Sequence, residues 1–369
     1  MRKIFIGTII LASTLVSVPS GWAAAKKPEI PKAPNFYWGG IWLNTPALTR
    51  RFFEGKVTLV YFWDYASINA IRDIGTLQKW LEAYRSFGFE ILWVHAPSYE
   101  FGKQRENVEE VLKRFGITGP VLLDNDFKLW DAYKVRSWPT KVLVNPQTAI
   151  IHTQVGEGNY MDIETRIREE LRDKQVSVML PTPVFAREPI RYSLDECGAI
   201  MTETPIGYDR FKWWGGQIAN KRWVDPDGTL LFKDRGDRVE RGFFAEGLWT
   251  NGAEGFIHAR ETEHLTDYLG LLYQSFEVYT VVHHTRAGET ARIYVTRDGE
   301  PVPEEMRGSD LKEDARGSTY FLMQEPRLYY LITQEDEEWH EIKLWTRSEG
   351  VSVNAFSFSN RCLSDFAHL

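Results

Sequence analysis

Cysteine is scarce in this sequence: the 369 residues include only Cys197 and Cys362. Neither has a second cysteine nearby, so neither shows the close spacing of a dithiol or zinc site. The stretch "FWDYASINAIRDI" (62–74), which follows an apolar run, contains no cysteine at all. Thiol chemistry within that stretch is therefore excluded, and neither cysteine has the setting of a catalytic thiol.

Basic tracts and long hydrophobic runs are also lacking, with one exception at the N-terminus. The net charge is −7 and the charged residues are well mixed, which argues against nucleic acid as a partner. The apolar run "IFIGTIILASTLVSV" follows Arg2 and Lys3 and precedes small residues. We interpret residues 1–25 as a signal peptide cut after Ala25, which predicts a periplasmic or secreted protein without a stable membrane span. An uncleaved anchor is the alternative, disfavoured because the run is short and includes serine and threonine.

If the protein is exported, its two cysteines can form a structural disulfide. An even number of cysteines in an exported protein suggests a disulfide, here between Cys197 and Cys362. Such a bridge would close a long loop and stabilise the fold by about 3–5 kcal/mol if unstrained. Two unpaired thiols are the alternative.

The first half of the chain alternates apolar strands with amphipathic helices. After an extended lead-in (26–44), the expected order is β-α-β-α-β-α-β-β-α over residues 45–173. The helices between early strands imply parallel pairing, and the late hairpin, with its turn at 145–147, is antiparallel. This order is typical of a thioredoxin-type α/β sheet.

The second half has a different sequence pattern. Residues 174–205 show no lasting helical period and are interpreted as a linker. From residue 206 to 369, short alternating runs are separated by Gly, Asp, Asn and Pro. This pattern predicts an all-β sandwich, with a jelly roll of the galactose-binding or carbohydrate-binding-module type as the expected topology.

The chain resembles the thioredoxin-like soluble region of DipZ-type cytochrome c biogenesis proteins, within the TlpA-like redoxins. Their motif F-W-T-Y-S-C-I-N-C-I-R corresponds here to Phe62–Arg72, "FWDYASINAIR". The likeness continues through "VHAPSYEF", "LDNDFKLWDAY", "RSWPTKVLV" and "VGEGNY", and through "TETPIGYDR", "VTRDGEPV", "EPRLYYLI" and "VSVNAFSF" in the second half. The resemblance implies a thioredoxin fold and an ancestry in thiol–disulfide exchange.

Both cysteines of that motif are absent from this sequence. Ser67 stands at the attacking position and Ala70 at the resolving position. Exchange requires a thiolate that attacks a disulfide and a second thiol that releases the product, so the pair cannot perform it. A serine nucleophile would need a nearby base, which the sequence does not suggest. The simpler expectation is that the Ser67 side chain caps the following helix.

The rest of the expected binding site is present. Pro139 matches the cis-proline of the family, which in active members lies beside the cysteines and holds a substrate peptide. Its retention predicts a binding groove formed by Tyr65, Ala66, Ser67, Trp138 and Pro139. A purely structural proline is the alternative.

The aromatic residues of the second half suggest a different ligand. Tryptophan side chains can stack on the faces of sugar rings, and the candidates for this role are Trp213, Trp214 and Trp249. Packing in the core or between domains is the favoured alternative.

Three functions remain open on the sequence alone. The first is an exported, redox-inactive protein that binds a protein or peptide partner in the cell envelope. The second is an active thiol–disulfide oxidoreductase that uses Cys197 or Cys362, and the third is a carbohydrate-binding protein acting through the sandwich. No cofactor or metal is expected for any of them.

Overall fold

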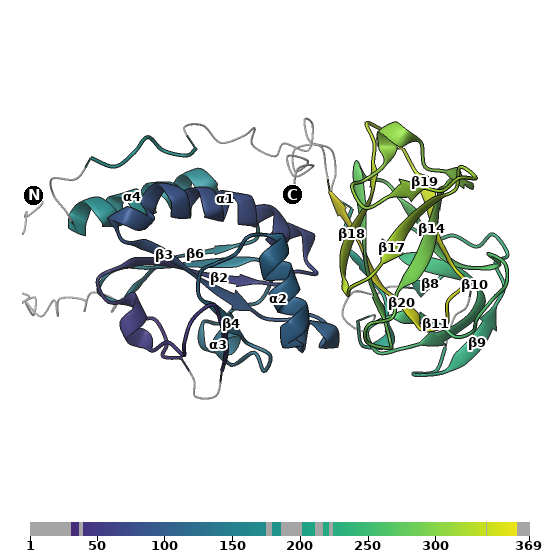
Figure 1. The fold of residues 1–369 in the computed structure, drawn as a ribbon, viewed down its shortest axis with the longest axis horizontal. Coiled ribbons are helices and arrows are strands. Elements are labelled where there is room, and N and C mark those ends of the chain that lie inside the picture. Colours follow the sequence, from purple (N-terminus) through teal and green to yellow (C-terminus); the bar gives the residue numbers. More distant parts are fainter. Residues whose placement is uncertain are drawn as a thin grey trace, which may run out of the picture.

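The computed structural model describes residues 31–36, 40–174, 179–185, 201–210, 217–220, 224–336 and 338–359. The predicted signal peptide, Cys197, Cys362, Trp213 and Trp214 lie outside these residues. Within the described part, no helix is both long enough and apolar enough to cross a membrane. An α/β region and an all-β region lie side by side (Figure 1).

The α/β region contains a six-stranded sheet in the order β1-β4-β3-β2-β5-β6. Strands β2, β3 and β4 are parallel, and β1, β5 and β6 pair antiparallel to their neighbours, as the predicted hairpin requires. The strands are β1 (Ile41–Leu43), β2 (Val57–Trp63), β3 (Phe89–His95), β4 (Val121–Leu123), β5 (Thr140–Val144) and β6 (Ile150–Val155). This order and pairing form a thioredoxin-like fold.

Helices cover both faces of this sheet. The helices are α1 (Ile68–Tyr84), α2 (Arg105–Arg114), α3 (Lys128–Ala132) and α4 (Tyr160–Lys174). Helices α1 and α4 run next to each other along one face, and α3 lies on the other (Figure 1). The two cores differ accordingly: α1, α2 and α4 share one apolar cluster, while α3 contributes to a second one with Phe53 and Phe62.

The all-β region contains one large curled sheet of 14 strands. Its strands are β7 (Thr204–Pro205), β8 (Gln217–Ile218), β9 (Thr229–Phe232), β10 (Gly242–Asn251), β11 (Phe256–His258), β12 (Asp267–Tyr273), β13 (Glu277–His284), β14 (Ala291–Arg297), β15 (Glu300–Pro301), β16 (Lys312–Glu313), β17 (Thr319–Met323), β18 (Arg327–Thr333), β19 (His340–Thr346) and β20 (Val351–Ser359). Strand β7 lies within the segment interpreted as a linker. The jelly-roll topology stays a prediction.

Strand β10 links the two halves of this curled sheet. Its first half pairs with β12, and its second half, from Gly247 onward, pairs with β9 and β11. Gly247 has φ +101°, and a Cβ atom there would lie 2.1 Å from Cγ of Asp267. Only glycine fits this position, because any side chain would collide with the buried carboxylate.

Candidate functional site

Ser67 occupies the N-cap position of α1, as its place in the motif predicts. Its backbone is extended, with φ −102° and ψ 115°, and its carbonyl oxygen accepts hydrogen bonds from the N–H groups of Ala70 (3.1 Å) and Ile71 (3.0 Å). The expected bond from a helix N–H to the Ser67 hydroxyl is absent from this helix end. The side chain is partly exposed, so residue 67 presents a hydroxyl at the start of the helix.

Ala70 lies one turn further along α1 and is fully buried. The Tyr61 hydroxyl donates to the Ala70 carbonyl oxygen at 2.7 Å, which fixes the backbone of this turn. Burial, with the nearby Asp73 carboxylate, raises the pKa of Tyr61, so this hydroxyl stays a donor. Residues 67 and 70 therefore lie one turn apart at the start of α1, and neither has a sulfur atom.

The cis-proline is also in place. The Trp138–Pro139 peptide bond is cis, and Pro139 is buried. The Trp138 indole donates to the Ala96 carbonyl oxygen at 2.8 Å and packs 4.6 Å from the Trp130 ring, on the α3 side of the sheet. Trp138 is therefore partly exposed but faces away from the α1 cluster.

Tyr65 and Ala66 do not form the predicted groove. They are 1% and 3% exposed, and Tyr65 stacks on the His95 ring at a centroid distance of 5.2 Å. Of the five predicted groove residues, only Ser67 and Trp138 keep partial exposure. The groove prediction is corrected on this point, because the tyrosine packs into the core where an open site would need it at the surface.

Asp64 lies beside the helix start and organises the neighbouring loop, through contacts with Ser98 and His95 that the sequence did not predict. One carboxylate oxygen accepts from the Ala66 N–H at 3.1 Å and lies 3.4 Å from His95 Nε2. The other accepts from the N–H of Ser98 at 3.0 Å and from its hydroxyl. Burial alone would raise the pKa of Asp64, but His95, Ser98 and Ala66 outweigh it and lower that pKa. Asp64 follows β2 and His95 ends β3, so the shared edge of two parallel strands was the available signal.

The loop that Asp64 holds carries contacts to the all-β region. The Ser98 carbonyl oxygen accepts from Arg210, whose guanidinium also lies 4.2 Å from the Tyr99 ring. The next residue, Glu100, donates its N–H to Glu254 at 2.9 Å. Asp64 therefore connects the start of α1 to the seam between the two regions.

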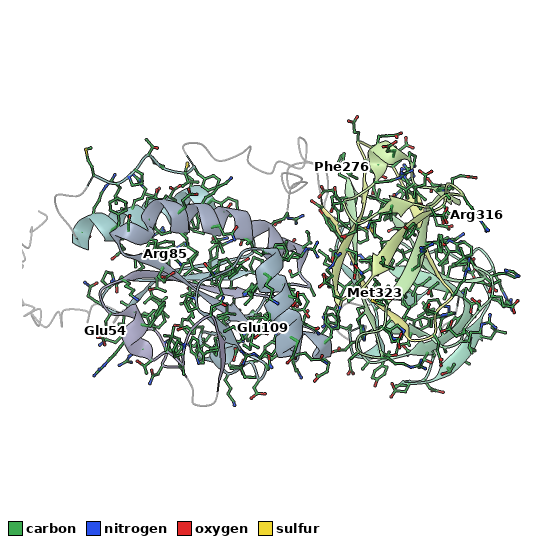
Figure 2. All side chains as sticks on the ribbon, viewed as in Figure 1. Glu54, Arg85, Glu109, Phe276, Arg316 and Met323 are labelled. Carbon is green, nitrogen blue, oxygen red and sulfur yellow. The ribbon has the colours of Figure 1, made fainter. Side chains whose placement is uncertain are left out.

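Apolar side chains complete this seam. Tyr279, Val281, Leu328 and Ala355 of the all-β region belong to the same buried cluster as the core of α1. A small cavity of about 60 Å³ remains, lined by Tyr65, Ile68 and Ile71 on one side and by Tyr279, Leu328 and Tyr330 on the other. A second cavity of about 220 Å³ lies nearby between Phe101, His283 and Met323. Met323 is on the side of the all-β region that faces the α/β region (Figure 2).

One fully buried ion pair and one partly buried ion pair hold the first turns of α1. Arg72 binds Glu157 through Nε (2.8 Å) and Nη2 (3.1 Å). Lys141 Nζ lies 2.5 Å from Asp73, which also accepts from the Tyr160 hydroxyl at 2.7 Å. Burial raises the pKa of Glu157, and Arg72 partly opposes that rise. No motif in the sequence pointed to these pairs, which join α1 to β5 and to the end of β6.

We expect Asp64→Ala to lower the free energy of unfolding by about 1–3 kcal/mol, because the N–H groups of Ser98 and Ala66 lose their acceptor. The contacts that the following loop makes with the all-β region should weaken as well. Amide hydrogen exchange should accelerate in residues 97–101. The pKa of Asp64 is lowered in the folded state, so its stabilisation is present above the ordinary aspartate pKa and is lost as pH falls through the folded value. The difference in stability from wild type should therefore shrink in acid.

Asp126→Ala is the matched control for this prediction, since Asp126 is exposed and pairs with the exposed Lys128. Equal exchange rates for 97–101 in both variants would contradict the role of Asp64.

Comparisons with known proteins agree with this geometry. Residues 202–359 match the family described as thioredoxin like C-terminal domain. DipZ from Mycobacterium tuberculosis and from Mycobacterium bovis is 31% identical over 282 residues, which cover 76% of this chain. The chain is homologous to the thioredoxin-like region of DipZ. The match spans 38% of the length of DipZ itself.

The DipZ relationship extends to simpler oxidoreductases. The thiol–disulfide oxidoreductase ResA from Halalkalibacterium halodurans is 28% identical over 114 residues, covering 31% of this chain and 62% of ResA. The thioredoxin domain of a thiol–disulfide oxidoreductase from Bacteroides vulgatus aligns with a TM-score of 0.31 at 24% identity, over 37% of this chain and 96% of that domain. The match to ResA relates this chain to thiol–disulfide oxidoreductases, although its own motif lacks both cysteines.

Trp249, the described member of the predicted sugar-facing set, is a core residue. It is fully buried, stacks on Phe256 at 5.8 Å and donates from its indole to the Glu246 carbonyl oxygen at 2.8 Å. The core alternative holds for Trp249, and a sugar-stacking role for it is wrong. Its phase along β10, shared with buried Phe243 and Ala245, was a usable signal.

Proposed function

We propose that this chain is an exported, redox-inactive thioredoxin-fold protein that binds a protein or peptide partner in the cell envelope. The observation that carries the proposal is the start of α1. A hydroxyl and a methyl group stand where the motif has two sulfurs, while the cis peptide bond before Pro139 is present and the Tyr61 hydroxyl holds the backbone of Ala70. A scaffold that keeps its shape without its redox groups is suited to binding rather than to electron transfer.

The surface available to a partner is narrower than the sequence suggested. It is centred on the partly exposed side chain of Ser67 and on the exposed Asn69 at the start of α1, because Trp138 packs on the α3 side of the sheet. Tyr65 lies beneath this surface, where it stacks on His95 and lines the small cavity between the two regions. The export signal predicted at residues 1–25 would place this surface outside the cytoplasm, where related oxidoreductases would find disulfide substrates.

The experiment is partner capture with the full mature chain and two charge variants of α1. Ser67→Arg places a bulky cation at the helix start, and Glu82→Arg places one at an exposed position near the far end of the same helix. We expect wild type and Glu82→Arg to retain the same envelope protein and Ser67→Arg to lose it. Retention of that protein by Ser67→Arg, or capture of nothing by wild type, would contradict the proposal.

An oxidoreductase acting through Cys197 or Cys362 is the competing function. It predicts that the wild-type chain reduces disulfides and that this activity disappears in Cys197→Ser or in Cys362→Ser. The binding proposal predicts no such activity.

A further inference from the structure

The seam cavity, the space of about 60 Å³ between the two regions, is bounded by apolar side chains from both. Ile68 and Ile71 of α1 and Val111 of α2 line it on one side, and Tyr279 of β13 and Leu328 of β18 line it on the other. Strand β18 is on the side of the all-β region that faces α1 and α2 (Figure 1). All of these side chains are buried except Ile71, which is partly exposed. The cavity therefore lies beside the first turns of α1, where the surface proposed for a partner begins.

The size and lining of the cavity limit what it can hold. An apolar cavity of about 150 Å³ in a protein accommodates one benzene molecule. At about 60 Å³, the seam cavity is too small for an aromatic ring and fits the end of a branched aliphatic side chain. The hydroxyl groups of Tyr279 and Tyr330 add no free polarity, because they donate to Glu277 at 2.8 and 2.9 Å. Burial of aliphatic carbon in this space favours binding.

One of the two guanidinium groups at the cavity is already paired. Arg327 donates to the Asp310 carboxylate from Nη1 (3.0 Å) and Nη2 (2.7 Å), and to Glu325 from Nε (2.9 Å). Its Nη1 also donates to the Leu328 carbonyl oxygen at 2.8 Å. Four of the five N–H groups of Arg327 are thus engaged, which leaves little donor capacity for a ligand.

Arg114, the other cation that lines the cavity, has free donors. Its guanidinium lies 3.7 Å from Glu325 and 5.7 Å from the centre of the Phe115 ring, and among the described residues it donates no hydrogen bond. The side chain is 36% exposed. Partial burial and the nearby Arg327 lower the pKa of Arg114, and Asp310 and Glu325 oppose this only in part. A hydrogen-bond acceptor placed beside Arg114 would therefore relieve an incompletely satisfied cation.

The charges around the cavity suit a neutral ligand. The two cations, Arg114 and Arg327, stand beside two carboxylates, Asp310 and Glu325, so the four charges sum to zero. Ser309 also lines the cavity, and its hydroxyl has no hydrogen bond within the part of the chain that the structure describes. A hydroxyl group accepts as well as donates. Arg114 and Ser309 thus offer a free donor and a free acceptor beside an apolar space, which matches a peptide group and its side chain.

We propose that the seam cavity binds a branched aliphatic side chain from an extended segment of the partner protein, and that peptide groups of this segment bond to Arg114 and Ser309. The peptide carbonyl oxygen accepts from the guanidinium, and the peptide N–H donates to the hydroxyl. Ile68 follows Ser67 in the chain, so the segment reaches the cavity from the surface already proposed for the partner. The inference rests on the partner-binding proposal and names the feature of the partner that is recognised.

The test probes an array of acetylated and amidated peptides with the full mature chain, followed by titration of the peptide that binds best. Capped ends carry no charge, so binding reports on side chains and peptide groups alone. We expect the bound peptides to share a valine, leucine or isoleucine. Replacing that residue with alanine should weaken binding on the order of 10- to 60-fold, the loss of two or three buried carbon atoms. Phenylalanine should also bind poorly, because its ring exceeds the cavity.

Two variants of the chain and one matched control accompany the titration. Arg114→Met keeps the length of the side chain without its donors and should weaken binding about 10-fold. Ile71→Trp fills the cavity from a partly exposed position and should abolish binding. Lys113→Met removes the neighbouring cation, which is 70% exposed and pairs with Glu110, and should leave the affinity unchanged. The thermal midpoint of each variant shows whether its fold is intact.

The inference is overturned if wild type binds no capped peptide, if the bound peptides share no branched aliphatic residue, or if folded Arg114→Met and Ile71→Trp bind as well as wild type. Partner capture separates this failure from that of the proposed function. If Ile71→Trp retains the same envelope protein as wild type, the cavity is not the site of recognition, although partner binding stands. If wild type binds the predicted peptides but captures no envelope protein, the cavity assignment holds and the partner proposal fails.

Discussion

Replacing Lys141 with methionine is expected to lower the free energy of unfolding by about 3–5 kcal/mol, because it leaves the buried Asp73 carboxylate without its cation. Both side chains are at most 1% exposed, and Asp73 keeps the Tyr160 hydroxyl, at 2.7 Å, as a neutral side-chain donor. Methionine preserves the apolar length of the side chain, so lost packing contributes little. Urea denaturation followed by tryptophan fluorescence measures the loss.

The double substitution Asp73→Asn/Lys141→Met separates the charge from the packing. It removes the unpaired charge and should recover a large part of the stability, since replacing a whole buried pair is far less costly than breaking it. A loss below about 1 kcal/mol for Lys141→Met alone would contradict the assignment of this pair as buried and ionised.

Restoring both sulfurs is expected to have the second large effect. Ser67→Cys/Ala70→Cys should raise the rate of disulfide reduction over the wild-type chain by on the order of 100-fold, because it supplies the attacking and resolving thiols at once. Residue 67 lies at the start of α1, where the helix dipole stabilises a thiolate, and residue 70 lies one turn further on. The insulin-reduction assay with dithiothreitol measures the rate.

The single variants show which step each sulfur serves. Ser67→Cys alone should form a mixed disulfide that does not turn over, and Ala70→Cys alone, at a fully buried position, should stay unreactive. A double variant that is folded but no faster than wild type would show that more than the two sulfurs has been lost from this site.

Much of the α/β fold follows from local pattern. The runs that became β2 and β3 are continuous and apolar, and the residues Ile74, Leu77, Leu81 and Tyr84 recur at helical spacing along α1. Strand β1, with three residues beside a proline-rich lead-in, is too short for any periodicity to show. It forms because its backbone pairs antiparallel with β4.

The candidate site was predictable only in part. The positions of Ser67 and Ala70 and the cis-proline follow from the motif. The burial of Tyr65 does not, because it depends on stacking against His95 and packing beside Phe101, which come from other segments of the chain.

The rate of disulfide reduction by the purified wild-type chain tests the central claim most directly. With Ser67→Cys/Ala70→Cys measured beside it to show that the assay responds, the wild-type rate should equal that of buffer with dithiothreitol alone. A wild-type rate well above buffer that disappears in Cys197→Ser or Cys362→Ser would contradict the claim that this protein binds without exchanging electrons.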